Sequence, residues 1–175
     1  MGMHYEELDA LTREFMIAAF EEEESSGNPY RGRQLSSLGR QRWPDAMRRA
    51  ITAGDDDSLM HEISKPELWL AVSNNRRVNL RNAASQLAVS EFNTWYVRGL
   101  TARLISEGVD TCEVYRAAPP RYSIAACASH EGVEFSCLEL FGSHRSRYWP
   151  IEDASAFAIP FQPGCHHSVR RLGAR

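Results

Sequence analysis

The sequence predicts an α+β fold in which a helical N-terminal two-thirds, with a long aromatic-rich helix, precedes a small β-rich C-terminal module. Two changes along the chain predict this. Apolar residues recur at steps of three and four up to Gly108, the period of an amphipathic helix, whereas apolar and polar residues alternate from Cys112 onward, as in a strand. All four cysteines also lie in the last third. We therefore expect a helical domain over 1–110 and a Cys/His module over 111–175 packed on it.

Composition narrows the class of protein. The net charge of −3 gives the chain no overall attraction to nucleic acid, and no apolar run approaches the ~20 residues that a membrane span needs. The first residues lack a basic segment followed by an apolar stretch, so no secretory signal is expected. We expect a cytoplasmic protein whose cysteines are reduced.

The first predicted helix covers 5–24, with Leu8, Leu11 and Phe15 on its apolar face. It ends in four glutamates, 21–24. Because the helix dipole disfavours anions at the C-terminal end, we expect this end to be frayed and solvated.

Two shorter helices should follow. One begins near Ser36 or Ser37 and runs to Ala53, before Gly54, and Pro44 would either divide it or start it. The next extends to Ile63, with the aspartates 55–57 as its cap.

Residues 76–108 carry the strongest helical signal and should form the centre of the core. A stripe of small and aliphatic residues ends near Leu87, and a second, aromatic stripe begins at Phe92, so a helical hairpin is expected with Ser90 as the cap of its second helix and Gly108 just beyond that helix. A strand is expected over 112–117 and another short one over 133–140. The remainder shows no helical period.

Charge is distributed unevenly near the N-terminus. Residues 1–30 hold eight acids against one base, and residues 31–50 hold six arginines against one acid. Codon bias is one explanation, since Lys65 is the only lysine; the other is that guanidinium groups bind carboxylates and phosphates bidentately. The second explanation makes these arginines a candidate partner interface, in which electrostatics sets specificity. They are Arg31, Arg33, Arg40, Arg42, Arg48 and Arg49.

A Cys/His cluster in the last third is the candidate metal site. Cys127 and His130 form a C-x-x-H pair, and Cys165 and His167 form a C-x-H pair. Thiolate and imidazole are the ligands that zinc prefers, so these four could close a tetrahedral zinc site. The alternative is that the cysteines are small buried hydrophobic residues and the histidines lie on the surface.

Two functional alternatives stay open. The pattern A-x-x-L-x-V-S over 84–90 is typical of helix-turn-helix DNA readers, in which Arg98 or Arg103 would contact DNA, although the bulky Phe92 and Trp95 suit a core better. The histidines could instead build a metal-dependent nuclease site. They are His130, His144, His166 and His167. No nucleotide-binding loop or nucleophile elbow occurs.

The C-terminal third resembles the head-morphogenesis family of tailed phages, the minor capsid proteins related to the Mu head protein. That family ends in a cysteine, three residues, an acid-Gly pair and an aromatic, followed later by P-x-H-P-x-C-R and a short apolar strand. Residues 127–135 (CASHEGVEF) resemble the first half and residues 160–169 (PFQPGCHHSV) the second. The chain departs from the pattern at Ile124, Gln162 and His166, where the family has Cys, His and Arg.

The resemblance implies a non-enzymatic structural protein of a phage or prophage virion, acting in head morphogenesis or at the head–tail junction. Its partners would be capsid, portal or neck subunits or further copies of itself, with DNA contacts that are not sequence-specific. It would be found in the virion, and in the host cytoplasm during assembly. No cofactor is expected unless the Cys/His cluster binds zinc, and the departures at Ile124 and His166 favour a structural role for that cluster.

Overall fold

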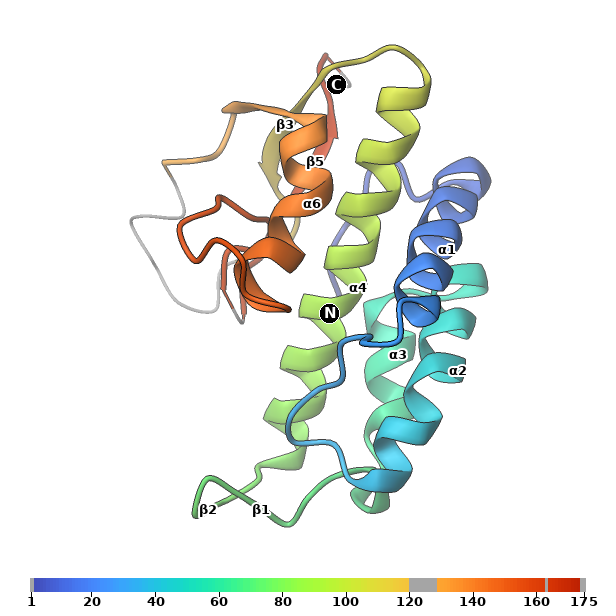
Figure 1. Cartoon of the computed structure of the whole chain (residues 1–175), viewed down its shortest axis with the longest axis vertical. Coiled ribbons are helices and arrows are strands. Elements are labelled where there is room, and N and C mark those ends of the chain that lie inside the picture. The colour runs from blue at the N-terminus through green and yellow to red at the C-terminus, as the bar shows by residue number, and fades with distance from the viewer. Residues whose placement is uncertain (1, 120–128, 163, 174–175) are drawn as a thin grey trace.

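The computed structural model describes residues 2–119, 129–162 and 164–173, and it confirms the α+β class. Helices lie on both sides of one long central helix, and a small sheet lies near the C-terminus (Figure 1). The elements are α1 (Ala10–Ser25), α2 (Ser37–Ala53), α3 (Asp56–Ile63), η1 (Pro66–Leu68), β1 (Val72–Ser73), β2 (Arg76–Arg77), α4 (Leu80–Ser106), β3 (Thr111–Arg116), β4 (Glu134–Ser136), α6 (Cys137–Tyr148) and β5 (His167–Arg171).

Helix α4 is the centre of the molecule, and it is one continuous helix of 27 residues. The predicted hairpin with a cap at Ser90 is therefore wrong. Both expected stripes belong to a single buried row at four-residue steps, which passes Ser90 without interruption. Its members are Ala84, Ala88, Phe92, Tyr96, Leu100 and Leu104. Gly108 lies just beyond the helix with a positive φ of 75°, as expected.

Helix α1 differs from its prediction at both ends. It begins at Ala10, because the Asp9 carboxylate accepts a hydrogen bond from the Thr12 amide as an N-cap. Leu11, expected in the core, is 42% exposed, and Met16 and Phe20 are buried instead. This end is not frayed: the helix continues to Ser25, and arginines from other elements bind three of the four glutamates, which offsets the unfavourable dipole.

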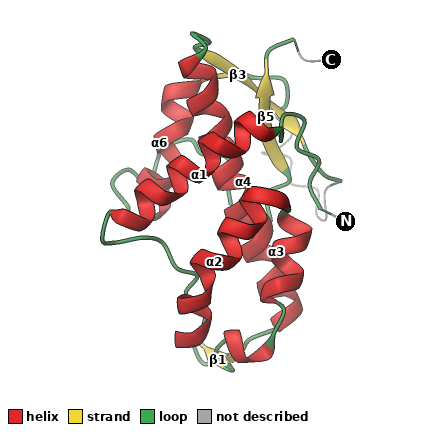
Figure 2. Cartoon of the chain, turned by 90° about the vertical axis from the view of Figure 1, so that its right-hand side faces the viewer, coloured by secondary structure: helices red, strands yellow, loops and turns green. Residues whose placement is uncertain are grey.

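Helices α2 and α3 lie where they were predicted, but the break or start expected at Pro44 is wrong. Ser36 caps α2 by accepting from the Gly39 amide at 3.1 Å, and Pro44 lies inside α2 without dividing it. Asp55 caps α3 in a reciprocal capping box with Ser58. Figure 2 shows the two helices side by side along the lower half of the molecule.

The sheet has the antiparallel order β4-β3-β5, which confirms the strand predicted after Gly108. The second predicted strand is shorter than expected. It ends at Ser136, whose hydroxyl caps α6 by accepting from the Glu139 amide. Helix α6 was not predicted, because its buried face includes Ser143 and His144, which do not contribute to an apolar stripe.

One buried cluster includes residues from both parts of the chain, such as Trp43 and Phe92 with Val114, Leu140 and Val169. The division at residue 110 into two domains stays a prediction. None of the helices in the described ranges is long and apolar enough to span a membrane.

Candidate functional site

A buried network of four charged side chains fastens α6 to the helical body. Arg145 on α6 donates to Glu23 of α1 at 2.6 Å and to Glu91 of α4 at 3.2 Å. Arg98 of α4 also donates to Glu23, at 3.0 Å. The Arg145 guanidinium lies over the rings of Tyr30 and Trp95, at 5.2 and 5.1 Å from their centroids. Two cations and two anions therefore balance each other between three helices.

His144 is held neutral beside this network. The Thr94 hydroxyl donates its single hydrogen to the Ser90 carbonyl, so at 3.2 Å it must accept from Nε2–H of His144. Nδ1 then carries no proton and faces Nη1 of Arg145 at 3.3 Å. Burial, followed by the positive charge of Arg145, holds the pKa of His144 well below its usual value.

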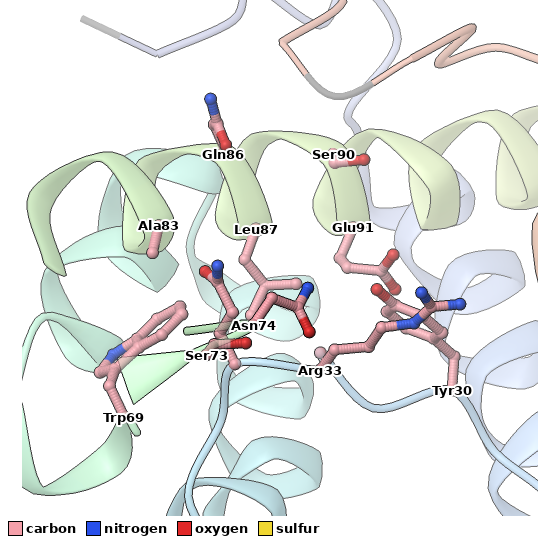
Figure 3. Close-up of a pocket in the computed structure, with 12 residues that line it drawn as sticks. Tyr30, Arg33, Trp69, Ser73, Asn74, Ala83, Gln86, Leu87, Ser90 and Glu91 are labelled. Atoms are coloured by element: carbon pink, nitrogen blue, oxygen red, sulfur yellow. The ribbon is translucent and has the colours of Figure 1, made fainter. Parts of the chain in front are cut away.

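A pocket of about 280 Å³ opens next to the network, between α4 and the segments 30–34 and 69–74. Figure 3 shows Leu87 and Glu91 pointing from α4 toward Tyr30, Arg33 and Asn74. A second cavity of about 300 Å³ shares part of this lining, so the two adjoin at Glu91. Burial raises the pKa of the Glu91 carboxyl while Arg145 lowers it. An acid wall beside an exposed arginine suits polar ligands rather than apolar ones.

The second half of the Cys/His motif contacts the acid of the first half. Cys165 is buried, with its Sγ 3.8 Å from Nδ1 of His167. Nε2 of His167 lies 2.9 Å from the Glu131 carboxylate, which also accepts from Arg116 at 2.8 Å. The hydrogen bond with His167, followed by the hydrogen bond and charge of Arg116, holds the pKa of Glu131 below its usual value. Sequence reasoning missed this role of Glu131, although its acid-Gly pair was the available signal.

The four predicted zinc ligands are only partly brought together. His167 is beside Cys165, but His130 packs against the rings of Phe157 and Phe135, with 4.8 Å between the His130 and Phe157 centroids. Cys127 lies outside the described residues. Within those residues no three Cys, His, Asp or Glu side chains are grouped to hold a metal ion. Zinc binding stays a prediction.

The six arginines predicted to form an interface divide into two sets. Three of them bind carboxylates of their own chain, which places Arg31 on Glu24, Arg48 on Glu21 and Arg49 on Glu62. Across the described part of the chain the other three have no carboxylate partner. These are Arg33, Arg40 and Arg42.

The helix-turn-helix hypothesis does not fit this geometry. Its turn would fall inside α4, where the helix is continuous. Arg98 is 9% exposed and bound to Glu23, and Arg103 is bound to Asp9 at 2.8 Å and to Glu107 at 2.9 Å. Neither arginine is available to contact phosphate. The nuclease hypothesis also loses His144, which is buried against α4 and hydrogen-bonded there.

No family model, curated protein or solved structure matches this chain.

Proposed function

We propose that this protein is a non-enzymatic structural subunit of a tailed-phage or prophage virion, acting in head assembly or at the head–tail junction. The observation that carries the proposal is the contact between Glu131 and His167. These residues come from the two separate halves of the motif shared with head-morphogenesis proteins, 36 residues apart, and they lie 2.9 Å from each other. The two halves of the motif therefore belong to one folded unit.

Strand β3 lies between the two halves of the motif and contacts both. The turn of the first half lies against it, since the Gly132 amide donates to the Val114 carbonyl at 2.8 Å. Gly132 has a φ of 77°, a conformation that favours glycine and so accounts for the glycine of the acid-Gly pair. The second half supplies β5, which pairs with β3 on its other edge.

Buried polar contacts fix the same unit to α4. The Asn93 amide donates to the His167 carbonyl at 2.8 Å, and the Ser168 hydroxyl donates to Asn93 at 2.7 Å. Together with the Arg145 network these contacts hold the C-terminal part rigidly on the helices. A rigid body of this kind suits an assembly subunit, which must present neighbouring surfaces in fixed positions.

The test is whether the chain is a component of particles. The gene would be tagged in the phage or prophage that carries it, and particles purified by density-gradient sedimentation would be analysed by mass spectrometry. We expect the chain to sediment with the particles and to remain bound at high salt. A matched strain would carry the gene with Asn93→Leu, which should weaken the anchoring of the C-terminal unit and reduce incorporation.

The proposal would be overturned by particles that lack the chain and that form in normal number after the gene is deleted. Deletion is expected instead to yield defective heads or heads without tails.

A further inference from the structure

Arginine and lysine side chains that pair with no carboxylate in the described residues gather at one end of the molecule. Elsewhere in the described residues, each arginine binds a carboxylate or, as for Arg13 and Arg147, backbone carbonyls. Seven cationic side chains remain that pair with no carboxylate in those same residues. They are Arg33, Arg40, Arg42, Lys65, Arg76, Arg77 and Arg81, and we call them the basic end.

Backbone hydrogen bonds join the segments that carry these residues. The Leu70 amide donates to the Gln34 carbonyl at 2.9 Å, and the Ser36 amide donates to the Leu68 carbonyl at 2.9 Å. Arg40 reaches back to the Arg33 carbonyl at 3.4 Å. The β1–β2 hairpin, the start of α2 and the start of α4 all lie at the bottom of the molecule in Figure 1, and Figure 2 shows β1 and the start of α2 at the same end.

The hairpin presents two of the arginines on a short, fixed support. Asn74 and Asn75 both have positive φ, of 50° and 59°, which is the two-residue turn that asparagine tolerates best. Arg76 and Arg77 follow immediately on β2, and both are exposed. Their guanidinium groups are therefore exposed to solvent rather than packed against the rest of the protein.

The segments that carry the basic end are poor in acids, although Glu91 lines a pocket with Arg33, and Glu62 lines one with Arg42 and Lys65. The segments 31–44 and 64–90 contain one carboxylate, Glu67. The remaining polar side chains there are mostly amides, which donate hydrogen bonds to phosphate oxygens without adding charge. They include Gln34, Gln41, Asn74, Asn75, Asn79, Asn82 and Gln86.

From these observations we infer that the basic end binds the phosphate backbone of duplex DNA without reading its sequence. The inference rests on the proposed function and deepens it by naming DNA as a partner of the subunit. Guanidinium groups bind phosphate bidentately, and several of them on one surface suit a regularly spaced polyanion. An acidic protein surface is the competing partner. It would need carboxylates spaced to match the basic end and a compact apolar centre, for which this end offers only three exposed large apolar side chains, Leu38, Leu70 and Val72.

Fluorescence anisotropy with a short labelled duplex of arbitrary sequence tests the inference on the full chain. We expect binding at about 50 mM salt that weakens steeply toward about 200 mM. Binding of the protein releases cations condensed on the DNA, and this release is less favourable when the salt concentration is higher. Arg76→Gln/Arg77→Gln should weaken binding at about 50 mM salt by about tenfold for each lost contact. The slope of log affinity against log salt should fall by about one per arginine.

Arg48→Gln/Arg49→Gln is the matched control, since it removes the same charge from arginines that already bind Glu21 and Glu62. It should leave DNA affinity and its salt slope unchanged. Absence of binding at about 50 mM salt would overturn the inference and favour the acidic protein partner. Equal weakening by both double variants would overturn it too, because overall charge would then explain the binding.

The two proposals fail separately. If the chain is built into particles but does not bind DNA, the proposed function stands and the inferred DNA contact is wrong. If the chain binds DNA but is absent from particles, the proposed function is wrong.

Discussion

Arginine serves two different purposes in two regions of this molecule. Between α4 and α6, Arg98 and Arg145 are largely buried, lie over aromatic rings and bind glutamates on other helices. At the basic end, exposed arginines such as Arg76 and Arg77 bind no carboxylate within the described residues. The first region uses arginine to join elements of the fold, and the second leaves the same group available to a partner.

The comparison shows that composition alone does not reveal what an arginine does. The burial of the side chain and the presence of an acid within reach decide whether its removal changes stability or binding. Of four experiments, the first and the last test this difference, and the other two test the buried side chains of the C-terminal part.

The largest effect should come from Arg145→Met. It leaves Glu91 and part of the Glu23 charge buried without compensation, which typically costs about 3–5 kcal/mol of unfolding free energy. Urea denaturation measures the loss. Arg147→Met is the control on the same helix, because Arg147 donates to the Ala156 carbonyl and has no acid partner in the described structure; it should cost about 1 kcal/mol. Equal losses would remove the distinction between the two arginines.

Cys165→Ser should have the next largest effect, about 1–3 kcal/mol, because it places a hydroxyl in a buried position built for sulfur. We expect a chelator to leave the urea midpoint of the wild-type protein unchanged and Cys112→Ser, at a buried cysteine outside the cluster, to cost a similar amount. Close to one zinc per chain in protein purified without chelator would contradict this expectation. It would also show that metal binding contributes to folding of the C-terminal part.

The third effect is a dependence of stability on pH through His144. Its pKa in the folded protein is depressed, so the unfolded state binds a proton that the folded state does not. Its contribution is fully present above the unfolded pKa of about 6.5 and is lost as pH falls below that value, by up to about 1.4 kcal/mol per unit. The difference in unfolding free energy between wild type and His144→Gln should therefore change as pH falls from 7 to 5.5. A constant difference would mean that His144 binds its proton equally well in the folded and unfolded states, and that its folded-state pKa is not depressed.

The smallest effect on stability should come from Arg76→Gln/Arg77→Gln, the variant that should weaken DNA binding most. Exposed side chains without partners usually change the unfolding free energy by less than about 0.5 kcal/mol. Thermal denaturation followed by circular dichroism measures this change. A loss close to that of Arg145→Met would mean that these arginines belong to the fold rather than to a binding surface.

Much of the helical part could be predicted because its signals are local. Ser36, Asp55 and Gly108 mark helix ends through their own side chains or backbone preference, and the structure has ends at these positions. The break at Ser90 was wrong because a change of residue size along one stripe resembled a change of helix. The helix α6 was missed because half of its buried face is polar, and the polar side chains of this helix find partners on α1 and α4.

The candidate site was predictable to a smaller degree. The pairing of motif halves was implied by the resemblance, but the contact of Glu131 with His167 depends on two strands meeting across β3. The six arginines of 31–49 were correctly identified as a charged stretch. Their division into bound and available groups depends on acids elsewhere in the chain, such as Glu62 on α3.

By itself the sequence determined the α+β class, the first strand of the sheet, the end of α2 and the cap of α3, since period and capping act over a few residues. Only the tertiary structure decided which charges are neutralised. Three of the four glutamates at the end of α1 are bound by arginines from α2, α4 and α6 and from the segment at Arg31, and the arginines of the hairpin meet no such acid in the described residues. Ion pairs form between groups that folding brings within a few ångströms, and their separation along the chain carries no record of that distance.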